Sequence, residues 1–98
     1  MNIVQATTEF TAGLQNIERA IIASVRDAGG TITANNFKWN QGKDWIPPPR
    51  DTIELEINAQ GKSFTARLSS EQVRDSSQQI SRPDVIAGVR NAVAALMH

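Results

Sequence analysis

The first third of the chain carries one apolar stripe at the spacing of an α-helix. Apolar residues recur every three or four positions: Phe10, Leu14, Ile17, Ile21, Val25 and Ala28. This period predicts a helix over about residues 8–28, with Thr7 or Thr8 as its N-cap and Gly29-Gly30 as its stop. The stripe favours packing against a sheet of the same chain. The alternative is a dimer seam between two such helices.

A strict alternation of apolar and polar residues follows between residues 52 and 68. Apolar residues take every second position in two runs separated by a polar turn: Ile53, Leu55 and Ile57, then Phe64, Ala66 and Leu68. A two-residue turn at Gln60-Gly61 would pair Leu55 with Ala66 on one face and Glu54 with Arg67 on the other. One register therefore satisfies both the apolar pairs and the charges, which predicts a β-hairpin over residues 52–68.

The last third of the chain predicts two helices. Ser69 to Gln72 has the sequence of a capping box and predicts a short helix through about Ser76. A polar linker follows, and a second capping box, Ser81 to Asp84, opens a helix over about residues 82–97. The apolar face of this helix is formed by Val85 or Ile86, Val89, Val93 and Leu96. Gly88 in its middle predicts a close backbone approach.

These elements predict an α+β fold in the order α-β-β-β-α-α. A short strand near residues 31–39 joins the hairpin in an antiparallel sheet of about three strands, and the N-terminal and C-terminal helices cover one face. We expect residues 1–98 to form a single globular domain. Such a sheet leaves its edges open, and a short edge strand, charged residues on the exposed face or a homodimer that completes the sheet would each protect them.

Composition excludes several classes of protein. The ten basic and ten acidic residues cancel, which argues against a binder of duplex DNA. The chain has no cysteine, so disulfides, cysteine-ligated metals and cysteine nucleophiles are excluded. No apolar run approaches the roughly 20 residues that span a bilayer, and the first residues do not resemble a secretory signal. We therefore expect a cytoplasmic protein with no membrane contact.

The sequence carries no recognisable catalytic or cofactor motif. Its one histidine is His98, the last residue, where a side chain is usually mobile. Glu54 and Glu56 form the clearest pair of carboxylates, but the hairpin register gives them Arg67 and Thr65 as neighbours on a solvated face. We expect no cofactor, no metal, no small-molecule ligand and no enzymatic activity.

The segment from residue 37 to residue 50 is the most distinctive part of the chain, because it holds both tryptophans and three consecutive prolines. Three prolines in a row continue neither a helix nor a paired strand, so this stretch must leave regular structure. Tryptophan and arginine are frequent binding hot spots, and a stiff loop loses little entropy when it docks. The candidate contact residues are Phe37, Trp39, Trp45, Ile46, Pro47, Pro48, Pro49 and Arg50.

The favoured interpretation is a small non-enzymatic protein-protein interaction module. It would act as an accessory or inhibitory subunit, or as a homodimer, through the loop 37–50. The alternative is a single-stranded nucleic-acid binder in which bases stack on Trp39 and Trp45 while Lys38 and Lys43 follow the backbone. The third interpretation is purely structural, with the rings covering the core.

Overall fold

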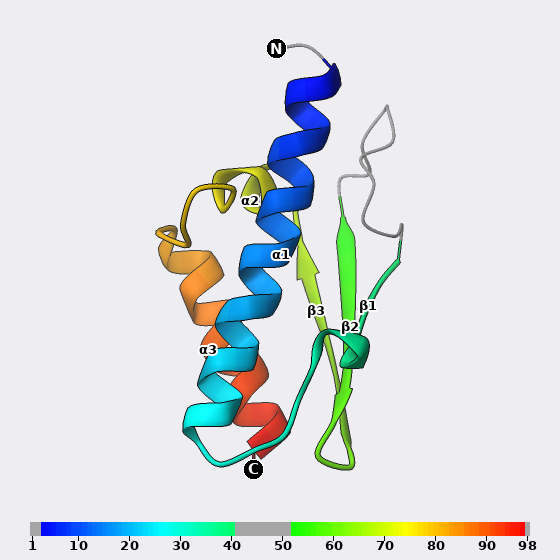
Figure 1. Ribbon diagram of the computed structural model, residues 1–98, viewed down its shortest axis with the longest axis vertical. Coiled ribbons are helices and arrows are strands. Elements are labelled where there is room, and N and C mark those ends of the chain that lie inside the picture. Colours follow the sequence, from blue (N-terminus) through cyan, green and yellow to red (C-terminus); the bar gives the residue numbers. More distant parts are fainter. Residues whose placement is uncertain (1–2, 41–51, 98) are drawn as a thin grey trace.

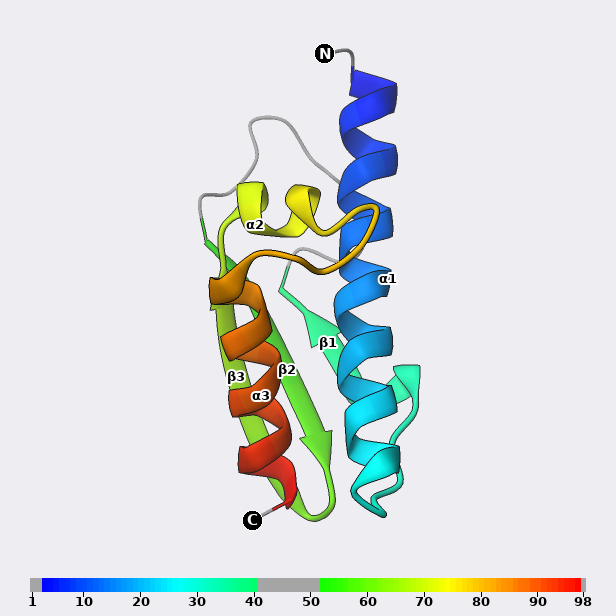
Figure 2. The same ribbon diagram turned by 90° about the vertical axis from the view of Figure 1, so that its left-hand side faces the viewer.

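The computed structural model describes residues 3–40 and 52–97, and of residues 3–7 only the helical backbone. The elements are α1 (Ile3–Asp27), the 3₁₀ turn η1 (Ala34–Asn36), β1 (Phe37–Trp39), β2 (Ile53–Ala59), β3 (Lys62–Leu68), α2 (Ser70–Asp75) and α3 (Pro83–Met97). The helices form one layer and the sheet the other (Figures 1 and 2). The predicted α+β class and the order α-β-β-β-α-α are confirmed.

The sheet is antiparallel, with the strand order β1-β2-β3 among the described residues. The hairpin has the predicted register, in which Leu55 pairs with Ala66 and Glu54 with Arg67. Along β2, alternate residues are buried against the helices and exposed on the opposite face. The Arg67 Nε lies 3.9 Å from a carboxyl oxygen of Glu54, both side chains being exposed. The alternation of apolar and polar residues, the strand register and the placement of opposite charges therefore all agree with the prediction from the sequence.

The hairpin closes through the expected two-residue turn. Gln60 and Gly61 both have positive φ, 56° and 71°. Two successive positive φ values define a type I′ turn, whose twist matches that of the flanking strands. Glycine adopts this conformation without steric cost, whereas glutamine tolerates it less well. The turn sets the register from which every other pair in the hairpin follows.

The apolar stripe of α1 packs against residues of the same chain. Phe10, Leu14, Ile17, Ile21 and Val25 are all at most 2% exposed, so the packing of this helix on its own sheet is what the structure shows. The helix begins at Ile3, and the prediction of an N-cap at Thr7 or Thr8 is wrong because both lie inside it. Its end is as predicted: the amides of Gly29 and Gly30 bond to the carbonyls of Arg26 and Val25 at 3.0 and 2.9 Å. This pair of bonds is a Schellman motif, and Gly29 takes the left-handed position with φ 90°.

The predicted strand near residues 31–39 is shorter than expected. The strand β1 contains only Phe37–Trp39, and residues 34–36 form a 3₁₀ turn. The Asn36 side chain explains the break, because its oxygen accepts from the Thr33 amide at 2.8 Å. Its nitrogen donates to the Asn58 carbonyl at 2.7 Å. Side-chain bonds to the backbone compete with strand pairing, which turns this segment.

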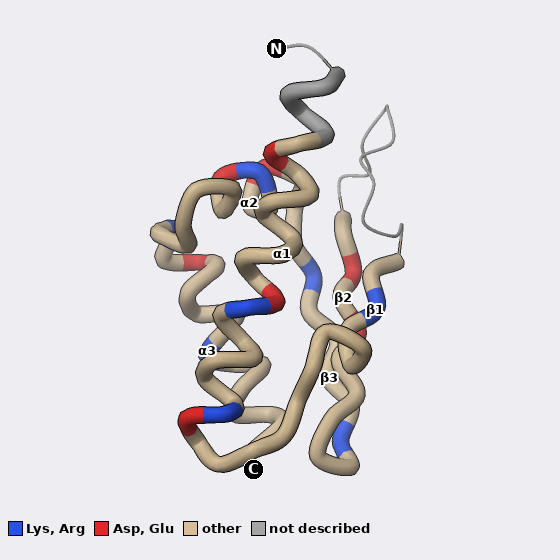
Figure 3. Tube along the Cα trace, in the orientation of Figure 1, with Lys and Arg blue, Asp and Glu red and all other residues tan. Residues whose placement is uncertain are grey.

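The C-terminal helices are held by side chains at their ends. In α2, the Ser69 hydroxyl accepts from the Gln72 amide, and the Gln72 side chain accepts from the Ser69 amide, which confirms the first capping box. The Asn16 side chain of α1 donates to the carbonyls of Ser76 and Ser77 at 2.7 and 3.0 Å. These bonds hold the linker between α2 and α3 against α1. Figure 3 shows acidic and basic residues interspersed along the described elements.

Two helical glycines differ in what surrounds them. A Cβ on Gly13 would stand 1.8 Å from the carbonyl oxygen of Val73, so α1 and α2 approach each other closely there. A Cβ on Gly88 would meet nothing within 4 Å. The predicted close approach at Gly88 is therefore wrong. Gly13, not Gly88, is the glycine that packing requires.

Alanine substitutions at these glycines should change stability in opposite directions. Gly13→Ala forces the backbone of α2 away and should lower the free energy of unfolding by about 1–3 kcal/mol, as overpacking does. Gly88→Ala should raise it by about 0.5–1 kcal/mol, because alanine is the better helix former. Urea unfolding of both variants at one low protein concentration measures this. A stable Gly13→Ala variant would contradict the close approach.

Candidate functional site

Trp39 and Phe37, the first two candidate contact residues, lie in the core. Their side chains are only 6% and 8% exposed. The indole Nε1 of Trp39 donates a hydrogen bond to the Glu18 carboxyl at 2.8 Å, and Glu18 itself is 4% exposed. A buried indole N–H needs a partner, and Glu18 supplies it. The fold alone explains both rings, as the structural interpretation of the sequence expects.

Strand β1 presents its two kinds of residue on opposite faces. Phe37 and Trp39 are buried beside Ile57 and Leu55 of β2, whereas Lys38 between them is exposed and pairs with Glu56. A strand alternates its faces in this way by geometry. Lys38 and the Trp39 ring therefore do not form one surface, and their arrangement does not favour a platform for stacked bases.

Glu18 was not recognised in the sequence, although a signal was present. It falls within the apolar arc of α1, four residues after Leu14 and three before Ile21. An acidic residue at such a position is buried only with a polar partner. The indole of Trp39 is such a partner, and the pairing joins residues 21 positions apart in the sequence.

Two backbone segments flank residues 41–51, one ending at Asn40 and the other containing Glu54, and hydrogen bonds hold them side by side. The Asn40 amide donates to the Glu54 carbonyl at 3.0 Å. The Glu54 amide donates to the Asn40 side-chain oxygen, also at 3.0 Å. These bonds extend the β1–β2 ladder by one polar pair beyond Trp39. The connection between the strands thus starts and ends on an ordered sheet.

The exposed sheet face beside these ends is hollowed. Lys38, Asn40, Glu54, Glu56 and Thr65 line the hollow, with part of Trp39. Charged side chains of both signs and neutral hydrogen-bonding side chains line it together. The hollow offers directional polar contacts next to the point where the connection leaves the sheet.

The remaining candidate contact residues lie outside the described residues. They are Trp45, Ile46, Pro47, Pro48, Pro49 and Arg50, and Lys43 of the alternative interpretation is outside them as well. Their role in partner contact stays a prediction from the sequence.

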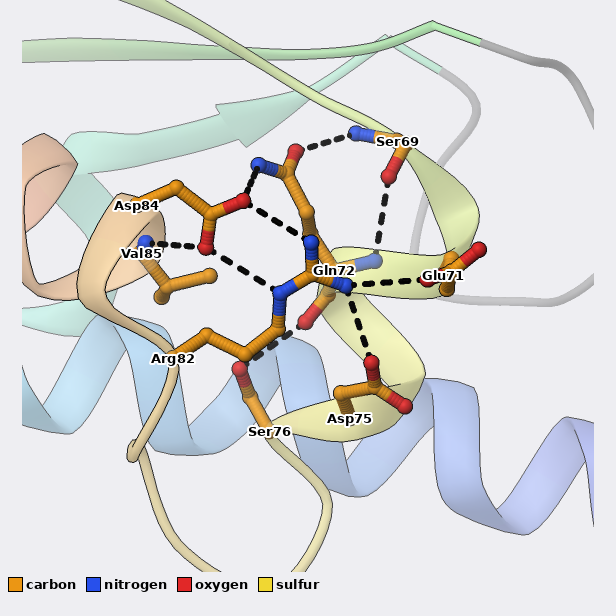
Figure 4. A network of polar contacts seen from close by, with 8 residues as sticks. All are labelled: Ser69, Glu71, Gln72, Asp75, Ser76, Arg82, Asp84 and Val85. Carbon is orange, nitrogen blue, oxygen red and sulfur yellow. Dashed lines mark hydrogen bonds and ion pairs between the residues drawn. The ribbon is translucent and has the colours of Figure 1, made fainter.

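A network of polar side chains joins α2 to the start of α3 (Figure 4). Arg82 lies at its centre, 2.9 Å from carboxyl oxygens of both Asp75 and Asp84 and 3.2 Å from Glu71. Gln72 donates to the other side of the network, reaching Asp84 at 2.8 Å. Asp84, the last residue of the predicted second capping box, accepts bonds from Gln72, from Arg82 and from the Val85 amide. The network clamps the two ends of the linker together.

The network shifts the ionisation of its members. The hydrogen bond from Gln72, followed by that from Arg82, holds the pKa of Asp84 below its ordinary value. The pKa of Arg82 is raised, first by its hydrogen bond to Asp84 and then by that to Asp75. Both directions favour the charged forms. The groups are open to solvent, so the network is a surface clamp.

An apolar hollow of about 70 Å³ lies between α1, β3 and α3. Its walls include Ile17, Leu55, Ala66, Val85 and Gly88, and Arg67, Gln72 and Asp84 stand at its polar side. In the described part of the chain, no group of three histidine or acidic side chains could hold a metal ion. Within the same residues, none of the helices has the length and apolarity needed to cross a bilayer.

Comparison with family models, with curated proteins and with solved structures finds no match to this chain. The functional proposal therefore depends on the residues and geometry of the chain itself.

Removing the indole N–H from Trp39 should destabilise the fold. Trp39→Phe leaves the buried Glu18 carboxyl without this donor and should lower the free energy of unfolding by about 1–3 kcal/mol. Glu18→Gln keeps an acceptor oxygen and should cost less. Denaturant unfolding of both single variants and of the double variant gives the coupling between the residues. Additive effects with no coupling would show that the hydrogen bond contributes nothing.

The Asp84 network should make stability depend on acid pH. Because the pKa of Asp84 is lowered in the folded state, its contribution is present above its ordinary value and is lost as the pH falls through the folded value. Asp84→Asn should therefore lower the melting temperature at neutral pH and flatten its fall below about pH 4. Thermal unfolding against pH measures this, with Asp27→Asn as control. Parallel curves for wild type and Asp84→Asn would contradict the assignment.

Proposed function

We propose that this protein is a small non-enzymatic protein-protein interaction module. It acts as an accessory or inhibitory subunit of a larger assembly, or as a homodimer. Its contact surface is the connection between β1 and β2, with Trp45, Ile46, the prolines 47–49 and Arg50 as the contact residues. Trp45 would be the anchor, and Arg50 would supply directional hydrogen bonds.

The anchoring of this connection carries the proposal. Asn40 and Glu54 bond to each other across its two ends, and the preceding residue, Trp39, is fixed to α1 through Glu18. Binding loops commonly combine a variable tip with a rigid base. Here both ends of the connection are bonded to each other and to the sheet.

The burial of Phe37 and Trp39 reduces the set of residues that can contact a partner directly. Phe37 and Trp39 support the connection from within the core, so we assign the direct contacts to the residues after Asn40. The hollowed face with Lys38, Glu54 and Glu56 lies next to the connection. It adds exposed charges of both signs at the rim, where polar groups tune specificity more than affinity.

Trp45→Ala should weaken the partner complex and leave the fold intact. The test measures the retention of proteins on the immobilised variant, in parallel with thermal unfolding. We expect retention of a partner at least about tenfold weaker, which is about 1.4 kcal/mol, and a melting temperature close to that of the wild type. Gln15→Ala, on an exposed position of α1, is the matched control.

Two results would contradict the proposal. If Trp45→Ala loses stability and binding in parallel, the ring belongs to the core and not to a contact surface. If binding instead weakens steeply as salt is added and nucleic acid copurifies with the protein, the nucleic-acid interpretation is correct.

A further inference from the structure

Strand β3 forms the longer of the two edges of the described sheet. It pairs with β2 alone, over all seven residues from Lys62 to Leu68, whereas the opposite edge strand, β1, has three residues. Figure 2 shows β3 and α3 together at one side of the molecule and α1 with β1 at the other. A long edge strand is a template for pairing with another strand.

The hairpin turn determines which backbone groups of β3 point outward. In a hairpin closed by a two-residue turn, the flanking residues, here Ala59 and Lys62, form a hydrogen-bonded pair, and such pairs alternate along an antiparallel ladder. Residues 62, 64, 66 and 68 therefore direct their amides and carbonyls to β2. Ser63, Thr65 and Arg67 direct theirs to the open edge. All three are exposed.

The side of the sheet that faces the helices is apolar as far as β3, but the helices do not cover it fully there. Phe64 and Ala66 lie on the helix face but are only half-buried, unlike Ile57 and Leu55, their partners in β2, which are completely buried. The nearby Gly88 of α3 leaves open space where a Cβ would stand. An added strand would place the side chains of its apolar face beside the half-buried Phe64 and Ala66.

We propose that β3 pairs antiparallel with β3 of a second copy of this chain, across a twofold axis at Thr65. Thr65 then faces Thr65 of the second copy, Ser63 faces Arg67, and Phe64 faces Ala66. All three outward residues of each strand enter hydrogen-bonded pairs, and the two sheets become one continuous sheet. A shift by two residues in either direction leaves one of these three without a partner in the opposing β3.

The side chains of β3 favour a second copy of the chain as the molecule that pairs with this edge. Phe64 of each strand lies opposite the small Ala66 of the other, so the half-buried apolar residues cover one another. Arg67 lies opposite Ser63, and Lys62 opposite Leu68, so no like charges face each other in this register. On the exposed face, Glu56 of each copy pairs with its own Thr65 and Lys38. The strand is complementary to itself on both faces.

This interface lies on a different surface from the one assigned to the proposed function. It uses the β3 edge, whereas the proposed partner surface lies between β1 and β2. Loss of dimerisation and loss of partner binding therefore come from different substitutions, Thr65→Lys and Trp45→Ala.

The test is the mass of the full chain in solution by analytical ultracentrifugation, over about a hundredfold range of concentration. We expect a monomer-dimer equilibrium for the wild type. Thr65→Lys places two lysines opposite each other at the axis and should raise the dissociation constant at least about tenfold, less so at high salt. Within one chain the new lysine faces Glu56, so the fold should be retained. Gln15→Lys, which adds the same charge on α1, should leave the equilibrium unchanged.

Hydrogen exchange on the wild type supplies a second readout that needs no substitution. The amides of Ser63, Thr65 and Arg67 should become protected only at dimer concentrations, whereas those of Phe64 and Ala66 should be protected at all concentrations. A monomer at every concentration, a folded Thr65→Lys variant that dimerises like the wild type, or a dimer with these three amides unprotected would each overturn the proposal.

Discussion

The hydrogen bond between Trp39 and Glu18 determines where the core of this protein ends. Strand β1 is only three residues long, and a strand of that length has few ladder bonds of its own. Burial of the Trp39 ring and its bond to α1 fix this strand beside β2 in the sheet and against the helix layer. Both side chains are buried, and the bond gives the indole N–H an acceptor and the Glu18 carboxyl a donor. The position of Asn40, and of everything that follows it, depends on this contact.

The sheet separates two kinds of surface. Its inner face joins the stripe of α1 in one apolar core, and its outer face carries Lys38, Glu54, Glu56 and Arg67 in solvent. The two open features of the fold lie away from the covered face. One is the polar base from which the β1–β2 connection leaves, and the other is the edge of β3 beside α3. A small domain of this design can present two interaction surfaces without exposing its core.

Much of the fold follows from local patterns. The stripe of α1, the alternation in the hairpin and the Ser69–Gln72 capping box each act within a few turns or across one tight turn, and the structure confirms all three. The predictions that are wrong concern places where the local structure depends on residues far away in the sequence. Asn36 ends the predicted strand because it reaches the Asn58 carbonyl, and Gly13 is required because Val73 of α2 lies against it. The candidate site is divided for the same reason, since the partners that bury Trp39, Leu55 of β2 and Glu18 of α1, are distant in the sequence. No periodicity in residues 37–50 contains that information.

Tryptophan emission with acrylamide quenching separates the two indoles, on two variants that each keep one of them. If Trp39 belongs to the fold and the contact surface begins after Asn40, the two variants should behave differently. With Trp45→Phe, which leaves Trp39, we expect blue-shifted emission that resists quenching at every protein concentration. With Trp39→Phe, which leaves Trp45, we expect readily quenched emission in the free, folded protein and protection when a partner binds. Protected emission from Trp45 in the dilute free protein, or exposed emission from Trp39, would contradict the account.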